Sequence, residues 1–438
     1  MPENKNAGIR DKSTQTKPIN MDSVYTEPET VISSDVEKYK KKNKKSKKSK
    51  NNIIIILCIV LFVVSVLLLA DSLAGDDNLK LVGFSFMEND KFGFMDKTGK
   101  ILIPALYDER IYSFSENLAV AVIDGKYGYI DKSGTQKIKM SFDSARAFSE
   151  KLAVVSINGS YGYINTKGDF VIKTQFEDAY NFNEGLAAVK IGGKWGYIDA
   201  KGNIKINPQY GAASNFSNGS AAVEKNGLWG LIDKKGNLIT EIEYESIDKS
   251  SANDMFILAK KGGIYGYINK NGKISLDFEY KSAGRFSEDL AKVSNNNLYG
   301  YINKKGNFEI YAVYPEASDF SEGLAFVIEN AGSNTPLYCV INKNGDKIIQ
   351  EQFSGYRNFK GGVAAVSVGD SWGVIDKEGK YIINPKYNAI SDFESNLAIV
   401  RVGNKVGVID KKGNIVVEIK YENNYSENYY GLSMVLEK

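Results

Sequence analysis

The stretch Leu186–Tyr210 reads LAAVKIGGKWGYIDAKGNIKINPQY and decides the fold. Its β-branched and aromatic residues come in short runs that turn signals separate, a pattern typical of strands and not of helices. The predicted elements are a strand over Leu186–Ile191, a tight turn at Gly192-Gly193, a strand over Trp195–Asp199, a turn over Asp199–Gly202 and a strand that opens at Ile204–Ile206. They form a three-stranded antiparallel meander, which a longer loop to Phe216 closes.

The same unit recurs ten times from Leu79 onward. The glycine of an Asp/Asn-x-x-Gly turn returns every 34 to 39 residues, at Gly99, Gly134, Gly168, Gly202, Gly236, Gly272, Gly306, Gly345, Gly379 and Gly413. Another glycine stands six residues earlier in nine units, with Cys339 as the exception, and a Tyr or Phe follows that position by fourteen residues in all ten. A fixed period of this length indicates a solenoid, a propeller or another stacked array.

Each repeated position has a mechanical reason. The Asx side chain of the turn can accept backbone N–H groups, and its glycine suits the left-handed conformation of a hairpin bulge. Trp195 and Tyr197 flank Gly196, so both rings point to one face while the glycine admits another backbone on the other face. One unit buries too little surface to be stable alone, so we expect the units to stack their rings on one another.

These residues resemble the WG-repeat family of bacterial proteins, whose units read roughly FxEGLAxVxxxxKWGYIDxxGxxVIxPxY. The match is close over Phe182–Tyr210 and over Phe359–Tyr387, and the resemblance covers about residues 79–430. It implies a β-rich binding or structural array, surface or membrane-associated, and names no ligand. The motif Trp is kept only at Trp195, Trp229 and Trp372, and the eighth unit is lengthened around Asn330–Pro336.

The sequence leaves two architectures open. An open superhelical array, or solenoid, accepts any number of units and tolerates the irregular spacing. A closed β-propeller usually needs four strands and 40 or more residues per blade. Because each unit has about 34 residues and three clear strands, the sequence favours the open array, with the propeller as the alternative.

The N-terminal segment predicts a membrane anchor. Ile53–Ala70 is an apolar run without a charge, long enough to cross a bilayer as a helix, and nine lysines lie within Lys38–Lys50 before it. The positive-inside rule then keeps the N-terminus in the cytoplasm and exports the repeats. We expect a disordered Lys-rich tail over 1–50, a transmembrane helix over 51–71 and the repeat domain over 79–438. A cleaved signal peptide is the competing interpretation.

Composition excludes several classes of function. The chain has no His, which excludes Ser-His-Asp and Cys-His catalysis and every zinc motif that needs His. Its two cysteines, Cys58 and Cys339, are too far apart in sequence and context to suggest a disulfide, and a small buried residue is the expected role of Cys339. Residues 71–438 carry 43 basic and 46 acidic side chains, so the repeats offer no basic excess to nucleic acid.

Three patterns invite a site, and each has a structural explanation. The turn acids suggest calcium, but the position alternates between Asp and Asn as an Asx turn allows: Asp96, Asp131, Asp199, Asp233, Asp376 and Asp410 against Asn165, Asn269, Asn303 and Asn342. The loop acids Glu116, Glu150, Glu184, Glu288 and Glu322 suggest glycosidase carboxylates, but they recur once per unit. The aromatics suit sugar stacking, but core packing explains most of them. We therefore predict no catalytic, metal or cofactor residues and cannot name binding residues.

The resulting hypothesis is a membrane-anchored extracytoplasmic binding or scaffold module, not an enzyme, which contacts cell-wall glycan or an envelope protein. Many weak sites on one array would give avidity. The alternative is a transmembrane sensor or structural scaffold that couples the repeat ectodomain to the cytoplasmic tail. The sequence leaves the ligand and the oligomeric state open.

Overall fold

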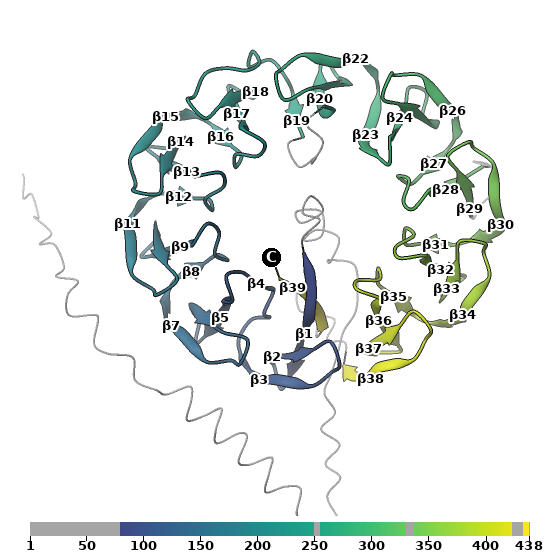
Figure 1. Ribbon diagram of the computed structural model, residues 1–438, viewed down its shortest axis with the longest axis horizontal. Helices are drawn as coiled ribbons and strands as arrows, with labels where there is room; N and C mark the ends of the chain where they lie inside the picture. The colour runs from purple at the N-terminus through teal and green to yellow at the C-terminus, as the bar shows by residue number, and fades with distance from the viewer. Residues whose placement is uncertain (1–78, 249–254, 330–336, 423–431, 438) are drawn as a thin grey trace, which may run out of the picture.

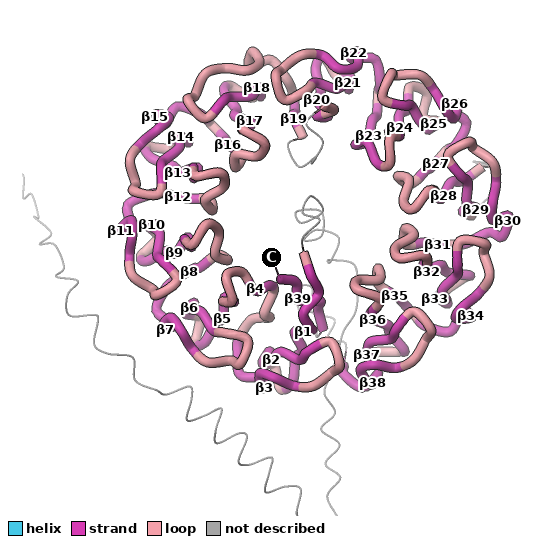
Figure 2. Tube along the Cα trace, in the orientation of Figure 1, coloured by secondary structure: helices cyan, strands magenta, loops and turns pink. Residues whose placement is uncertain are grey.

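The repeats form a ring of antiparallel β-sheets (Figure 1). The computed structural model describes residues 79–248, 255–329, 337–422 and 432–437. Within these ranges the strands make ten sheets, and the regular elements are strands joined by loops (Figure 2). No membrane-spanning helix is found in this part of the chain. The predicted tail over 1–50 and the predicted helix over 51–71 lie outside the described residues.

One blade illustrates the others. The short strand β12 (Asp178–Ala179) lies at the inner edge of the ring, and β13 (Leu186–Ile191), β14 (Lys194–Asp199) and β15 (Ile204–Tyr210) follow outward (Figure 1). All three pairings are antiparallel, and β13 and β14 pair in register from Leu186↔Asp199 to Ile191↔Lys194. The meander predicted from Leu186–Tyr210 is therefore confirmed, and the loop after it supplies the first strand of the following blade.

The remaining strands occupy four positions from the inner edge to the rim. The inner strands are β8 (Ser144–Ala145), β16 (Ala212–Ala213), β19 (Ser246–Ile247), β23 (Ser282–Ser287), β27 (Glu316–Ala317), β31 (Gly355–Tyr356) and β35 (Ala389–Ile390). The second strands are β1 (Lys80–Glu88), β5 (Ala119–Ile123), β9 (Leu152–Ile157), β17 (Ser220–Lys225), β20 (Ile257–Lys261), β24 (Leu290–Ser294), β28 (Leu324–Ile328), β32 (Val363–Val368) and β36 (Leu397–Val402). The third strands are β2 (Lys91–Asp96), β6 (Lys126–Ile130), β10 (Ser160–Asn165), β18 (Leu228–Asp233), β21 (Ile264–Ile268), β25 (Tyr299–Asn303), β29 (Tyr338–Asn342), β33 (Ser371–Asp376) and β37 (Lys405–Asp410). The outer strands are β3 (Ile101–Tyr107), β7 (Gln136–Phe142), β11 (Phe170–Phe176), β22 (Ile274–Tyr280), β26 (Phe308–Tyr314), β30 (Lys347–Phe353), β34 (Tyr381–Tyr387) and β38 (Ile415–Glu422).

The C-terminal strand closes the ring. β39 (Leu432–Glu437) pairs antiparallel with β1 and parallel with β4 (Ser113–Phe114), so the first and last described strands share one sheet. Leu432 and Val435 of β39 are buried, and Glu437 forms an ion pair with Lys132 of the neighbouring blade. Chain ends that meet in one sheet leave no free edge between the first and last blades.

The all-β repeat array is confirmed, and its form is the propeller that the sequence ranked second. The preference for an open superhelical array is wrong, because β1 and β39 pair and close the ring. About 34 residues suffice for a four-stranded blade because the inner strand contributes only two paired residues, as in Asp178↔Lys190 and Ala179↔Val189. The segment that the sequence assigns to a loop therefore supplies the fourth strand of the blade.

The glycine of the motif permits a bulged outer strand. β14 and β15 pair at Trp195↔Tyr210 and Tyr197↔Ile206, with a register shift between them. A Cβ on Gly196 would lie 2.5 Å from the carbonyl oxygen of Ile206 and 2.6 Å from the nitrogen of Pro208, closer than side chains tolerate. The close backbone approach predicted at Gly196 is thus observed, and only glycine allows it.

Neighbouring blades are joined by a repeated aromatic contact. The ring of Tyr197 packs 4.8 Å from that of Phe216 in the next blade, and its hydroxyl donates a 2.7 Å hydrogen bond to the Ser214 carbonyl. The same pair of contacts recurs at Tyr129, Tyr163, Tyr267 and Tyr301. These tyrosines are almost fully buried. Burial of such rings and satisfaction of their hydroxyls stabilise the stack of blades.

Removal of residues 432–438 tests the closure. Leu432 and Val435 are almost fully buried, and burial of such a side chain contributes about 1.5–3 kcal/mol. We expect a lower unfolding midpoint in urea and a larger radius of gyration by small-angle scattering. Removal of Lys438 alone is the control. An unchanged radius and midpoint after the longer deletion would show that β39 does not hold the ring closed.

Tyr197→Phe tests the contact between blades. The substitution removes the hydroxyl and leaves the Ser214 carbonyl without this partner, which should lower the free energy of unfolding by about 1–2 kcal/mol in urea titrations. Tyr180→Phe is the matched control, because the Tyr180 ring contacts Trp195 while its hydroxyl makes no hydrogen bond to the described residues. Equal losses in the two variants would contradict a specific role of the Tyr197 hydroxyl.

Candidate functional site

The recurring loop glutamates join blades and do not converge on an active site. Glu184 accepts a 3.0 Å hydrogen bond from the amide of Gly219, in the equivalent loop of the next blade. Glu116, Glu150, Glu288 and Glu322 accept amides of their own next blades in the same way. Lys234 of that next blade also pairs with Glu184 at 3.0 Å. Each carboxylate is therefore occupied by a structural contact.

The environment of Glu184 fits this role. Partial burial alone would raise the pKa of its carboxyl, but the ion pair with Lys234 and the hydrogen bonds from backbone amides hold the pKa below its usual value. A lowered pKa keeps the group ionised at neutral pH, which suits an acceptor of amide hydrogen bonds and not a general acid.

The turn acids behave as Asx residues. Asp199 Oδ1 accepts the amides of Lys201 at 3.0 Å and Asn203 at 2.9 Å. Asn165 and Asn342 accept the corresponding amides with the same geometry. The Asn203 amide side chain and these backbone bonds lower the pKa of Asp199. No group of three or more Asp, Glu or Cys side chains in the described ranges is arranged to hold a metal ion.

Cys339 is the small buried residue that the sequence predicts. Its side chain is 3 % exposed, and its Sγ donates to the carbonyl oxygen of Val327 at 3.6 Å. Burial raises the pKa of this thiol, which disfavours a reactive thiolate at neutral pH.

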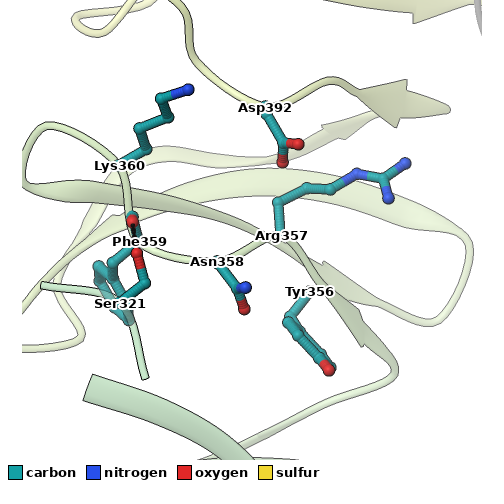
Figure 3. Close-up of a pocket in the computed structure, with 7 residues that line it drawn as sticks. All are labelled: Ser321, Tyr356, Arg357, Asn358, Phe359, Lys360 and Asp392. Carbon is teal, nitrogen blue, oxygen red and sulfur yellow. Dashed lines mark hydrogen bonds between the residues drawn. The ribbon is translucent and has the colours of Figure 1, made fainter. Parts of the chain in front are cut away.

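The candidate site is a pocket at the inner edge of the ring, where three blades meet. It has a volume of about 300 Å³ and is lined by Ser321 of the β27–β30 blade, by Tyr356, Arg357, Asn358, Phe359 and Lys360 of the β31–β34 blade, and by Asp392 of the β35–β38 blade (Figure 3). Most of these side chains carry a polar group. The pocket is at the small end of the range for ligand sites in proteins.

Two opposite charges face this pocket without pairing. Arg357 and Asp392 come from successive blades, and both line this pocket (Figure 3). Within the described residues Arg357 Nε is buried and has no hydrogen-bond partner, and the Asp392 carboxylate forms no ion pair or hydrogen bond. Buried polar groups without a partner are costly, so native proteins keep them where they have a use.

At another interface of the ring, the residues at the two equivalent positions form an ion pair. Asp248 occupies the place of Arg357 in its own blade, four residues after the aromatic that ends the outer segment, and Arg285 occupies the place of Asp392 in the blade after it. Arg285 donates to Asp248 through Nε at 2.6 Å and Nη2 at 3.2 Å. At one interface, therefore, Asp248 and Arg285 form a bidentate ion pair. At the other, Arg357 and Asp392 have the reverse order of charge and form no ion pair.

Two of the links between blades are replaced on one side of the pocket, at the interface after the β31–β34 blade. At four interfaces a loop Ser donates to the Phe carbonyl of the next blade, and one of them is Ser321, which donates to Phe359 at 2.6 Å on the other side of the pocket. In the β31–β34 blade Lys360 stands in place of that Ser and pairs with Glu394. Gly361 stands in place of the loop glutamate. The space beside Gly361 is occupied by Lys411, whose ammonium donates to the Gly361 carbonyl.

Aromatic residues position the polar groups of the pocket. The Arg357 guanidinium lies 5.6 Å from the centre of the Trp372 ring, a cation–π contact that holds the side chain at the wall. Tyr356 stacks on Phe326 with ring centres 4.4 Å apart and meets Tyr338 edge-on at 4.6 Å. The Tyr356 ring is thus committed to packing.

Burial raises the pKa of the Asp392 carboxyl above its ordinary value; Arg357 and Lys360 oppose this shift, and Glu394 adds to it. The charged form is therefore less favourable in the folded protein than in the unfolded chain. Residues that serve a ligand commonly cost stability in this way.

Sequence reasoning missed this site. Non-repeating polar residues are the expected sign of a specialised site, and Lys360 and Glu394 are such residues, whereas the positions of Arg357 and Asp392 carry Arg146 and Asp319 in other units. The available signal was a set of departures inside the repeat. Where Lys360 and Glu394 stand, the other described units have Ser115, Ser149, Asn183, Ser217, Ser287 and Ser321. The two departing units are consecutive, and the stacking of their blades brings Lys360 and Glu394 together.

Asp392→Asn should stabilise the protein at neutral pH. Because the folded-state pKa of Asp392 is raised, the wild type loses stability as the pH rises through that value, and the neutral variant does not. The difference in free energy of unfolding should be largest near pH 7 and vanish below the unfolded-state pKa of about 3.9. Urea titrations at several pH values measure it. Asp319→Asn, at the equivalent exposed position, is the control; a variant less stable than the wild type at pH 7 contradicts the assignment.

Solved structures align with this chain at low identity and low TM-score. The eukaryotic initiation factor aligns with a TM-score of 0.41 and 11% identity, over 82% of this chain and 98% of that chain. PorZ, a bacterial surface component of the type-IX secretion system of Porphyromonas gingivalis, aligns with a TM-score of 0.26 and 12% identity, over 72% of this chain and 52% of its own. Kluyveromyces lactis Hsv2p aligns with a TM-score of 0.30 and 13% identity, over 59% and 96%. No curated protein matches the sequence of this chain.

The family model described as WG containing repeat matches ten successive segments. They are residues 92–127, 127–161, 161–195, 195–229, 229–263, 265–299, 299–331, 338–371, 372–405 and 407–437. The matches cover most of the chain and run from one third strand to the next, so each spans parts of two blades. The chain therefore belongs to the family of proteins built from WG containing repeats.

Proposed function

We propose that this protein is an extracytoplasmic binding module without catalytic activity, held at the membrane by its N-terminal segment, and that its ligand binds in the pocket between Arg357 and Asp392. The ligand belongs to the cell envelope, as a wall glycan or a surface protein. One observation carries the proposal: Arg357 and Asp392 are half-buried, carry opposite charges and line one pocket without an ion pair or hydrogen bond between them, although the equivalent pair Asp248 and Arg285 closes.

The chemistry of the pocket supports binding and not turnover. Its polar groups are a guanidinium, an ammonium that already pairs with Glu394, an amide, the hydroxyls of Ser321 and Tyr356, and one carboxylate. The Ser321 hydroxyl donates to the Phe359 carbonyl, so its proton is held by a backbone acceptor and not by a side-chain base. Recognition by directed hydrogen bonds needs no more than this set.

The location rests on the sequence. The apolar run Ile53–Ala70 follows a block of lysines, a combination that anchors a protein with its N-terminus in the cytoplasm. Everything from Leu79 onward would then face the envelope, where the ring can meet glycan or protein.

Exchange of the two charges tests the binding site. The double variant Arg357→Asp/Asp392→Arg has the charge order of Asp248 and Arg285, so it should form an ion pair that fills the pocket. We expect the full-length variant to remain folded and to lose at least tenfold in capture by isolated cell envelopes. The matched control, Asp248→Arg/Arg285→Asp, should bind as the wild type does. Unchanged capture by the first variant rejects the proposed site.

The location predicts the outcome of protease treatment. Protease added to intact cells should digest the repeats and spare a tag placed before Met1, because only the region after the apolar run would be exposed. The same treatment of lysed cells removes the tag and is the control. Repeats that survive on intact cells but not after lysis would contradict an extracytoplasmic domain.

A further inference from the structure

The open pair of charges also restricts the kind of group that the pocket accepts. Arg357 offers only donors, and Asp392 when ionised offers only acceptor oxygens. A ligand that satisfies both must accept from one wall and donate to the other. Because the two residues sit on successive blades, it must do so within the width of one blade interface.

Ligand groups that carry charge of a single sign fit this arrangement poorly. A carboxylate or phosphate would pair with Arg357 but would meet Asp392 and the nearby Glu394. An ammonium would pair with Asp392 but would meet Arg357 and Lys360. Glu394 already neutralises Lys360, so the wall has no excess of either sign. Like charges brought together in a partly buried site disfavour binding.

Hydroxyl groups fit it well, because each is both a donor and an acceptor. Two neighbouring hydroxyls can donate to the Asp392 carboxylate while they accept from the Arg357 guanidinium. Asn358 and Ser321 add neutral polar groups to the same pocket. The volume of about 300 Å³ suits one sugar ring and not a long chain.

From this complementarity we infer that the pocket binds the vicinal diol of a single neutral pyranose unit, held between Arg357 and Asp392. The inference rests on the proposed function and names its ligand class. Recognition is by hydrogen bonds and not by aromatic stacking, because one face of Tyr356 is covered by Phe326 and its edge contact with Tyr338 fixes the ring. Selectivity therefore follows the orientation of the two hydroxyls.

Trp372 is a positioning residue for this diol. Its ring contacts the Arg357 guanidinium, and it would lie 3.4 Å from a Cβ atom placed on Gly355. Trp372 therefore orients the N–H donors of Arg357 without itself lining the pocket. A smaller ring that keeps the hydrophobic contact should weaken the alignment of Arg357 and spare the fold.

The test measures binding of defined probes to the full-length protein in detergent by calorimetry. The probes are the methyl glycosides of mannose, glucose and galactose, their deoxy analogues that lack one hydroxyl of the diol, glucuronate, and the dipeptide D-alanyl-D-alanine as a zwitterion. We expect at least one neutral glycoside to bind, its matching deoxy analogue to bind at least tenfold more weakly, and glucuronate and the dipeptide to bind more weakly than the glycoside.

Single substitutions identify the contacts. Arg357→Lys and Asp392→Asn should each weaken the glycoside by about 10- to 100-fold, the loss expected for one hydrogen bond to a charged group. Trp372→Phe should weaken the glycoside less than Arg357→Lys, and Trp229→Phe is its control in another blade. Circular dichroism checks that each variant is folded, and Lys292→Met, which removes a charge at a different interface, should bind normally.

The outcomes separate this inference from the proposed function. Equal or tighter binding of glucuronate or the dipeptide, or no loss on removal of a diol hydroxyl, overturns the neutral diol. Failure of every glycoside, while envelope capture still depends on Arg357 and Asp392, also overturns it and leaves the binding function intact. Envelope capture that survives the charge exchange overturns both.

Discussion

The contact between one blade and the next is the interaction on which this structure depends. A tyrosine on the third strand buries its ring against a loop phenylalanine of the following blade and donates its hydroxyl to a carbonyl of the same segment, as Tyr197 does with Phe216 and Ser214. A single blade has too little core to be stable. Because each blade supplies half of two interfaces, the array gains its full stability only when every blade has both neighbours. β39 pairs with β1 and so joins the C-terminal end of the chain to the first blade.

Uniform interfaces leave few places for a ligand. The loop serine, the loop glutamate and the turn lysine tie most neighbouring blades together, and they use up the polar groups that a ligand would need. At the interface after the β31–β34 blade, Lys360 replaces the loop serine and Gly361 the loop glutamate, while the turn lysine, Lys411, still donates to the Gly361 carbonyl. Space and unsatisfied charge then coincide at one interface, which is where recognition becomes physically reasonable.

The two Arg–Asp pairs differ in what they contribute to the fold. At one interface Asp248 and Arg285 close and contribute to packing. At the other, the reversed pair stays open, and desolvation raises the pKa of the half-buried Asp392 above that of an ordinary aspartate. The cost falls on a single interface among many. A ring of similar blades can tolerate it because the remaining interfaces keep the array together.

The repeat, its strands, its turns and the reason for its glycines follow from the sequence, because local rules of turn chemistry and alternation act within a few residues. Leu186–Tyr210 forms the predicted strands, and the Asx turn at Asp199 and the close approach at Gly196 are as expected. The sequence also indicated that the loop glutamates are structural. It could not show that the ring closes, because closure depends on the small rotation between blades and on β39 finding β1. Nor could it find the pocket, because Arg357 and Asp392 are separated by a whole repeat and only the stacking of blades brings them to one cavity.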